Sequence, residues 1–224
     1  MDTLRKALVI GAHPDDCALG AAGFAVLLKR TGWRITFLTM TDGELGGDPQ
    51  LRIEEERVSA RLLGVDLDFC HLADGRMQGP ETVRAIEQKL ATHKPDLILT
   101  HAPLDSHSDH RVLSESVVSA ARRHSSLLFY EGPSTQTFGA SLKIDITRAW
   151  DVKVKSLLAH ASQRERVRTV EWAEAAGRHR AWPEYRGVCE AFVPVRMNLN
   201  LMCPAIAEAV VPAQSADQAS WSIV

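Results

Sequence analysis

Two clusters of histidine and aspartate stand directly after apolar segments of this 224-residue chain. Residues 13–16 read His-Pro-Asp-Asp and follow the apolar residues 7–12, whereas residues 107–110 read His-Ser-Asp-His and lie beyond another apolar run. Hydrolytic zinc sites take three ligands from histidine and carboxylate side chains and leave a fourth position for water. Because sites in open α/β sheets lie at the carboxyl ends of the strands, the two clusters predict one hydrolytic metal site built from two loops.

His13, Asp16 and His110 can supply the ligands of such a site, and Asp15 can supply a general base. The metal would polarise a scissile carbonyl and lower the pKa of a water molecule, whose proton the base would take. Alternate residues of an extended segment face opposite sides, so the two adjacent aspartates are expected to have different tasks. The residues alone do not decide which aspartate binds the metal.

His107 lies three positions before His110, and a helical turn there would bring both rings to one region. A protonated His107 would stabilise an oxyanion or protonate a leaving amine. Asp109 would orient one of the rings through its second nitrogen.

Each of these residues also has an ordinary structural interpretation. A strand-end aspartate pair is often a helix N-cap, and a lone loop histidine is usually solvated. His101 is mainly expected to be such a solvated histidine. The alternative is that it lines the pocket, because it ends a strand. The cysteines predict reduced, mostly buried thiols, although Cys17 beside Asp16 has the alternative of contacting the metal or being oxidised.

Composition limits the remaining function classes. The chain is 45% hydrophobic and 24% charged with a formal net charge of -2, which predicts a globular core and no basic face for nucleic acid. No apolar run reaches the ~20 residues of a membrane span, and the N-terminal residues show no signal-peptide pattern. We therefore expect a soluble, cytoplasmic protein.

Strand and helix patterns alternate along the chain and predict an α/β fold, with a mostly parallel sheet flanked by helices in a single domain. The expected strands are residues 7–12, 34–40, 65–72, 96–101, 127–130 and 142–146. The expected helices are residues 18–31, 51–63, 81–93, 111–123, 151–166 and 170–180. The domain is expected over residues 1–204, and the tail of residues 205–224 would either fray or pack on a partner subunit.

Several motifs together resemble the LmbE-like (PIG-L) N-acetylglucosaminyl deacetylase family. They are Gly11-Ala12-His13-Pro14-Asp15-Asp16, Thr41-Asp42-Gly43-Glu44, Arg52 with Glu56, Leu63-Gly64, His107-Ser108-Asp109-His110-Arg111, Lys155 with His160-Ala161-Ser162-Gln163, and Cys189-Glu190-Ala191-Phe192. The last of these resembles the closing strand of the family, and the resemblance covers nearly the whole chain.

The resemblance implies a Rossmann-like deacetylase that depends on Zn²⁺ or another divalent metal such as Fe²⁺. Its substrate would be the N-acetyl amide of an N-acetylglucosamine-type sugar. Carried over by motif, His13, Asp16 and His110 are the metal ligands, Asp15 is the general base, and His107 is the cationic partner that stabilises the oxyanion. Since family members are often trimers or hexamers, the resemblance also suggests a homo-oligomer.

The chain departs from the family pattern at two places. Cys17 and Ala18 stand where many members have a glutamate, so a local hydrogen bond would be lost. Asp105 stands where mycothiol-type members have a tyrosine, which places the chain nearer to the bacillithiol-type or antibiotic-type branches.

The expected substrate contacts come from the loops around the metal site. The glycines of residues 42–49 would let the backbone approach a sugar. Arg52 would grip hydroxyls or an anionic aglycone, with a solvated arginine at a helix N-terminus as its alternative. The further candidates for binding substrate are Glu44, Asp105 and Gln163, together with Asp74, Arg76 and His160.

Two other functions fit the same residues. One is a thiol-conjugate amidase, with the same chemistry on a larger amide. The other is a degenerate, non-catalytic sugar- or nucleotide-binding module, which the missing glutamate favours and the complete ligand set disfavours. No Gly-x-Gly-x-x-Gly pattern follows the first strand, so dinucleotide binding is disfavoured.

Overall fold

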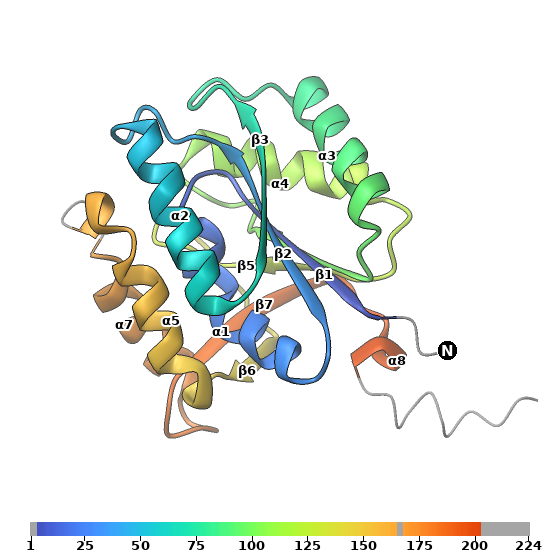
Figure 1. The fold of residues 1–224 in the computed structure, drawn as a ribbon. Helices are drawn as coiled ribbons and strands as arrows, with labels where there is room; N and C mark the ends of the chain where they lie inside the picture. Colours follow the sequence, from blue (N-terminus) through green and yellow to red (C-terminus); the bar gives the residue numbers. More distant parts are fainter. Residues whose placement is uncertain (1–3, 165–167, 203–224) are drawn as a thin grey trace, which may run out of the picture.

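The fold is a seven-stranded sheet between two layers of helices (Figure 1), and the computed structural model describes residues 4–164 and 168–202. The strands lie in the order β3-β2-β1-β4-β5-β7-β6. β1 to β5 are parallel to one another, whereas β7 is antiparallel to both β5 and β6. Their bounds are β1 Lys6–Gly11, β2 Arg34–Thr41, β3 Asp66–Leu72, β4 Leu97–His101, β5 Leu127–Tyr130, β6 Leu142–Asp145 and β7 Cys189–Arg196.

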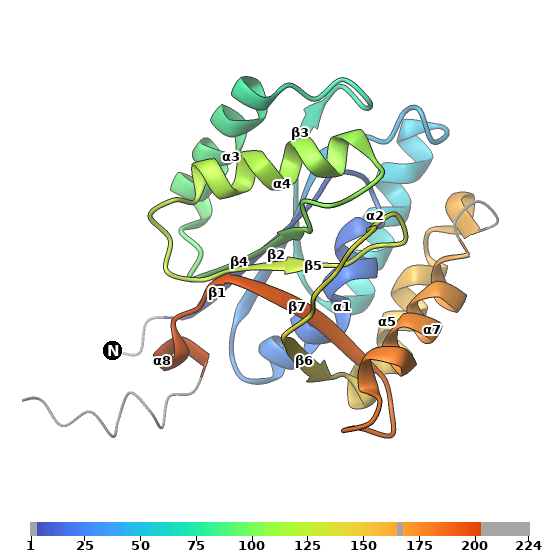
Figure 2. The ribbon, with the colours of Figure 1, turned by 180° about the vertical axis from the view of Figure 1, so that it is seen from behind.

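The helices divide between the two faces of the sheet, as the opposite views of Figures 1 and 2 show. One face carries α1 (Asp16–Arg30), α2 (Pro49–Leu63), α5 (Trp150–Leu158) and α7 (Thr169–Ala181). The other face carries α3 (Gly79–His93) and α4 (Ser108–Ala120). Shorter helical segments are η1 (Thr147–Ala149), η2 (Ala161–Gln163) and α8 (Leu199–Met202). Within the described residues, no helix is long and apolar enough to cross a bilayer.

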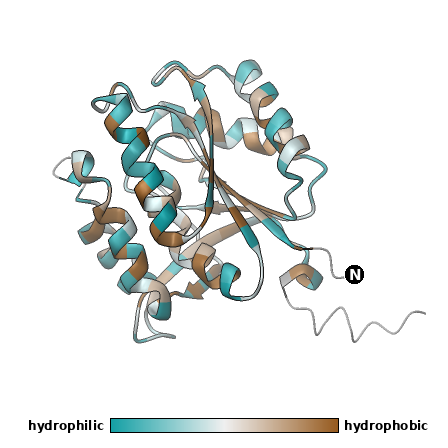
Figure 3. Cartoon of the chain, viewed as in Figure 1, coloured by the Kyte–Doolittle hydropathy of each residue, from teal (hydrophilic) through white to brown (hydrophobic). Residues whose placement is uncertain are grey.

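The core consists of two apolar layers, one on each side of the sheet. Side chains alternate along a strand, so in β1 Val9 packs in the layer under α1 while Leu8 and Ile10 pack in the layer under α3 and α4. Figure 3 shows hydrophobic residues along the strands and hydrophilic ones on the outer sides of the helices. Because both faces of β1 are buried, its sequence is apolar throughout rather than alternating.

The expected α/β fold is therefore confirmed, and most elements lie within a few residues of the predicted ranges. Three differences affect the site or its surroundings. α1 begins at Asp16 and α4 at Ser108, so both clusters reach into the first turns of helices instead of lying wholly in loops. The helix expected over residues 151–166 ends at Leu158, where a turn leads into η2. The expected closing strand is present as β7 and extends to Arg196.

The sheet order creates a crevice between β1 and β4. These strands are neighbours, but α1 follows β1 on one face and α4 follows β4 on the opposite face (Figure 2). The carboxyl ends of two such strands frame the place where open α/β sheets bind ligands. Both histidine–aspartate clusters lie at this crevice. The predicted tail of residues 205–224 lies outside the described residues, as does Cys203, and the predicted domain boundary stays a prediction.

We predict that Gly20→Ala destabilises the protein, although helix propensity alone would give a gain of about 1 kcal/mol. A Cβ at Gly20 would overlap the ring of Tyr130, whose hydroxyl donates a 2.9 Å hydrogen bond to Ile10 O in β1. Overpacking of this kind costs about 1–3 kcal/mol, which urea unfolding would measure. Gly79→Ala, where a Cβ has no atom within 4 Å, is the control. Equal stability of the two variants would contradict the prediction.

Candidate metal centre

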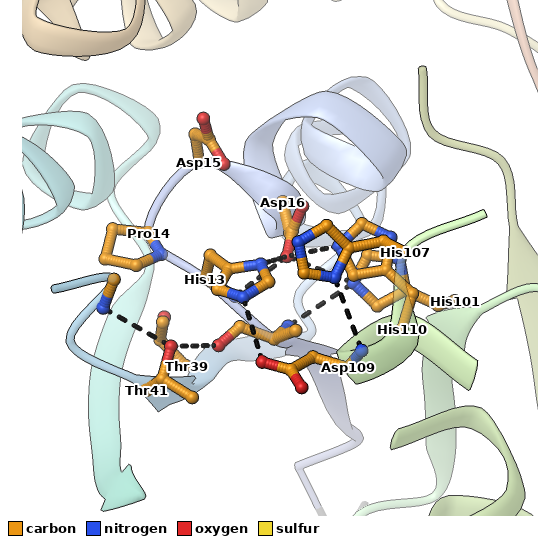
Figure 4. Close-up of polar contacts among 12 residues, drawn as sticks. His13, Pro14, Asp15, Asp16, Thr39, Thr41, His101, His107, Asp109 and His110 are labelled. Atoms are coloured by element: carbon orange, nitrogen blue, oxygen red, sulfur yellow. Dashed lines mark hydrogen bonds and ion pairs between the residues drawn. The ribbon is translucent and has the colours of Figure 1, made fainter. Parts of the chain in front are cut away.

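A sharp turn after β1 separates the two adjacent aspartates. Asp15 has a left-handed backbone with φ of 109°, and the next residue, Asp16, begins α1. The expectation of an extended tip is therefore wrong in its geometry, although its conclusion that the two carboxylates face different ways holds. In Figure 4 Asp16 points toward the histidines and Asp15 points away from them. Gly11 permits the turn because a Cβ there would lie 2.8 Å from Asp16 Cβ.

The predicted ligands converge on one carboxylate oxygen. Asp16 Oδ2 lies 3.4 Å from His13 Nδ1 and 3.5 Å from His110 Nε2. Ligand atoms at about 2.0–2.1 Å from a tetrahedral zinc ion stand about 3.3 Å from one another. These two distances and the N/O donor set suit a Zn²⁺- or Fe²⁺-sized ion at His13, Asp16 and His110. The described groups whose ligand atoms all lie within 4.8 Å of one another are Asp16–His101–His110, His13–His107–His110 and His13–Asp74–Asp109, so each holds only part of the predicted set.

The ring of His101 completes the surroundings of Asp16. Its Nε2 lies 3.1 Å from Asp16 Oδ2, and the ring stacks on His110 with centroids 3.8 Å apart. His101 is buried beneath the site and does not line the cavity. Burial and the neighbouring charge of His110 lower the pKa of His101 to about 4, so this ring is neutral at ordinary pH. The only sequence signal for this contact was the position of His101 at the end of a strand.

Carboxylates lie beside the second ring nitrogens of the two histidines that are predicted to bind the metal. His13 Nε2 lies 3.0 Å from Asp74 Oδ1 and 3.4 Å from Asp109 Oδ2. His110 Nδ1 lies 3.2 Å from Asp105 Oδ2. Such partners fix the ring orientation and tautomer of a metal ligand. Asp109 thus orients a ring as expected, and that ring is His13. Asp105, expected to contact substrate, lies behind His110 instead.

The two aspartates of the first cluster differ in electrostatics as well as in direction. Burial and the adjacent charge of Asp16 raise the pKa of Asp15 to about 7. Burial also disfavours the charged form of Asp16, but His110 and His101 hold the pKa of Asp16 well below its usual range. One carboxylate is thus ionised and suited to bind a cation, whereas the other exchanges a proton near neutrality, as a general base should.

His107 caps α4 and faces the same cavity. Its Nδ1 accepts a 3.3 Å hydrogen bond from the backbone N–H of Asp109, which leaves the proton of the neutral ring on Nε2. Its ring centroid lies 4.7 Å from that of His13 and 4.6 Å from that of His110. Burial and the nearby charges of His110 and His13 lower the pKa of His107. The geometry therefore favours a neutral hydrogen-bond donor over the expected cation.

The site opens into a cavity of about 560 Å³, enough for a sugar with part of its aglycone. Asp15, His107 and the three predicted ligands line it, and so do Arg52, Gln163 and Asp74 among the expected substrate contacts. Glu44 and Asp105 do not line it. Glu44 Oε1 instead accepts a 2.8 Å hydrogen bond from the backbone N–H of Asp74.

Arg52 is buried, so its alternative as a solvated arginine is wrong. Its guanidinium donates 2.8 Å hydrogen bonds to Gly43 O and Pro14 O. Side chains at Gly43 and Gly46 would overlap this guanidinium. These two glycines therefore make room for Arg52, which is a different purpose from the expected approach to a sugar.

Cys17 points away from the metal centre. Its Sγ lies 3.5 Å from Val9 O within the core, and burial raises its pKa well above the usual range. A buried thiol of this kind is inert, and the geometry gives no support to the alternative of a metal contact. Cys17, Cys70 and Cys189 are free.

The family model "PIG-L: GlcNAc-PI de-N-acetylase" matches residues 8–121, just over half of the chain, and this span contains both clusters. The chain belongs to the PIG-L family. The resemblance on which the sequence interpretation rested is thereby confirmed, and the sheet and crevice described above are those of a PIG-L protein.

Among PIG-L relatives, the diacetylchitobiose deacetylase of Thermococcus kodakarensis is 30% identical over 194 residues, which cover 71% of this chain and 70% of the relative. The crystal structure of the conserved protein TT1542 from Thermus thermophilus is 28% identical, with a TM-score of 0.79 over 84% of this chain and 94% of that chain. A 4-oxalmesaconate hydratase of Pseudomonas putida is 23% identical over 197 residues, covering 73% and 76%. Similarity alone therefore does not fix the reaction.

We predict that metal binding releases protons. Burial favours the neutral form of both rings, but neighbouring carboxylates outweigh it. Hydrogen bonds to Asp109, Asp16 and Asp74 raise the pKa of His13 well above 6.5. Asp16 and Asp105 raise the pKa of His110 to about 9. A metal ion must displace these protons, so affinity rises with pH and binding near pH 7 releases about two protons.

Calorimetric titration with Zn²⁺ in buffers of different ionisation enthalpy measures this release. It should fall as the pH is raised through the His110 pKa of about 9. A heat of binding that is the same in every buffer at pH 7 would contradict the assignment of these two rings as ligands.

Proposed function

We propose that this protein is a metal-dependent hydrolase that removes the acetyl group from the N-acetyl amide of an N-acetylglucosamine-type sugar or glycoconjugate. The observation that carries the proposal is that the two adjacent carboxylates at the crevice have different surroundings. His13 and His110 converge on ionised Asp16, while the separate carboxylate of Asp15, with a pKa of about 7, faces the same cavity. Membership of the PIG-L family and the deacetylase relative support this reaction.

His13, Asp16 and His110 would hold the metal, with Zn²⁺ as our first choice and Fe²⁺ as the alternative that the same donors suit. When bound, the ion polarises the amide carbonyl and lowers the pKa of a water molecule. Asp15 takes the proton of the attacking water and thereby becomes an acid. Burial raises the pKa of Asp15 and so makes it a stronger proton acceptor than an exposed aspartate.

His107 is proposed to donate a hydrogen bond from Nε2 to the oxyanion that forms when water attacks. Its Nδ1 is occupied by the backbone N–H of Asp109, so the ring presents its proton to the cavity in one orientation. A preorganised donor of this kind stabilises developing charge. The proton for the leaving nitrogen comes from Asp15, which holds it after the attack, because a neutral His107 has no acidic proton to give up near neutral pH.

The substrate is proposed to be a small N-acetylated aminosugar that occupies the cavity beside Gln163 and Arg52. The mixed charge of the chain supports a site without nucleic acid. The cytoplasm as its location and a homo-oligomeric state follow only from the sequence interpretation and stay proposals. The thiol-conjugate amidase and the binding module stay alternatives, and an assay on a panel of substrates separates them from the deacetylase.

That experiment measures amine release from a panel of N-acetylglucosaminides that carry malate, inositol, a second sugar or an aminoglycoside. The protein is assayed as purified, after chelation and after Zn²⁺ is restored. Turnover that disappears on chelation and returns with Zn²⁺ is the expected result. Bound metal without any turnover would favour an amidase or a hydratase-type reaction, and absence of both metal and turnover would favour a binding module.

We predict that Asp15→Asn retains metal but loses turnover by a factor of at least about 100, as expected for removal of a general base. The amide keeps the shape of the side chain but cannot accept the proton. Mass spectrometry measures whether the metal is retained, and the rate of acetate release measures the loss of turnover. Asp16→Asn is the contrasting variant, since it should lose metal as well. Normal turnover by metal-loaded Asp15→Asn would overturn the base assignment.

A further inference from the structure

One peptide group, between Pro14 and Asp15, lies between two side chains of the same helix. On one side Arg52 Nη2 donates a 2.8 Å hydrogen bond to Pro14 O. On the other side the backbone N–H of Asp15 donates a 3.1 Å hydrogen bond to Glu56 Oε2. Arg52 and Glu56 are four residues apart in α2, so they lie on one face of the helix, one turn apart.

The peptide needs such partners because of the conformation that follows it. Asp15 adopts φ of 109°, a region that residues with a Cβ disfavour and hold only when their surroundings enforce it. Its side chain makes no hydrogen bond to the start of α1. The bonds from α2 to both ends of the preceding peptide therefore supply fixed constraints at this turn.

Both side chains of the helix are themselves fixed. The guanidinium of Arg52 is anchored to Gly43 O at 2.8 Å, in the space that Gly43 and Gly46 leave open. The buried carboxyl of Glu56 accepts a 3.3 Å hydrogen bond from Thr39 Oγ1 in β2.

His160 lies behind Glu56, with Nε2 3.3 Å from Glu56 Oε2. His160 is almost fully buried, and neither of its ring nitrogens has a hydrogen-bond partner within the described part of the chain. Glu56 is thus the polar group that this ring faces.

We propose that Arg52 and Glu56 form a clamp on the Pro14–Asp15 peptide that holds Asp15 in its left-handed conformation and aims its carboxylate into the cavity. Both are positioning residues, and His160 packs behind Glu56. The inference rests on the proposed role of Asp15 as the base. It assigns Arg52 a task other than gripping substrate, because two of its donors are already bound to backbone oxygens.

The charge state of Glu56 is compatible with this task. Burial and the neighbouring Asp15 raise the pKa of Glu56 to about 8, so the neutral acid is the main form near pH 7. A neutral carboxyl can accept the Asp15 N–H through an oxygen without placing a full negative charge beside the base. A glutamine amide has the same shape and also offers an oxygen acceptor.

The test compares Glu56→Ala with Glu56→Gln, using N,N′-diacetylchitobiose as substrate. Loss of the acceptor in Glu56→Ala should lower kcat by about 10- to 100-fold, the cost of a displacement of about 1 Å in a reacting group. KM and metal content should stay near their wild-type values. Glu56→Gln should recover most of kcat, because the amide oxygen can replace the acceptor. If the negative charge of Glu56 were required instead, Glu56→Gln would stay impaired.

Glu55→Ala is the matched control. Glu55 is also buried in α2, but it binds the backbone and hydroxyl of Ser162 and not the turn. It should therefore lose comparable stability and keep kcat. Arg52→Lys, which replaces the planar fork of donors by a single ammonium group, gives a second measurement should Glu56→Ala fail to fold. It should lower kcat and leave KM nearly unchanged.

Amide hydrogen exchange at Asp15, followed by NMR, reports on the clamp without any substrate. Exchange should be faster in Glu56→Ala than in the wild type, and Glu56→Gln should restore its protection. A wild type that hydrolyses no N-acetyl sugar would refute the proposed function, and exchange alone would then decide on the clamp. The clamp would be overturned by full kcat or unchanged exchange in Glu56→Ala. It would also be overturned if Arg52→Lys changed KM alone, or if Glu56→Gln were as impaired as Glu56→Ala.

Discussion

The carboxylate of Asp16 is the group around which the site is organised. Its Oδ2 lies within 3.5 Å of nitrogens of His13, His101 and His110 and also accepts the backbone N–H of His13. A buried carboxylate is costly unless it is paired, and these rings provide the pairing. They come from the turn after β1, the end of β4 and the first turn of α4, so the site requires β1 and β4 to be neighbours.

Further carboxylates contact the rings around Asp16 and connect them to loops of the cavity wall. The carboxylate of Asp74 contacts His13 and also accepts the backbone N–H of Leu45 at 2.9 Å, while Asp109 accepts that of Gly75 at 2.7 Å. The loops after β2 and β3 are thereby connected to His13 and to α4. A change in one of these loops would consequently affect the His13 ring as well as the wall of the cavity.

The fold and the proximity of His13, Asp16 and His110 could be predicted because both depend on local patterns. Apolar strands and alternating helices specify a parallel sheet, and polar residues at strand ends gather at one crevice. The contacts of Glu44, Asp105 and Arg52 could not be predicted in the same way. Each has a polar group that could face substrate or protein, and only the packing of loops distant in sequence decides between them. The sequence did not determine the direction of these side chains, and their proposed contacts with substrate stay predictions.

The sequence by itself determined that both clusters follow apolar strands of a mostly parallel sheet, because the carboxyl ends of parallel strands lie at one edge. The neighbourhood of β1 and β4 came from the tertiary structure. The tertiary structure decided what each residue faces. It turned Asp15 away from Asp16 through a left-handed backbone whose N–H is bonded to Glu56 of α2, and it placed His101 beneath Asp16. The physical reason is that hydrogen bonds between segments far apart in the chain, and the burial that perturbs pKa values, exist only once the layers have packed.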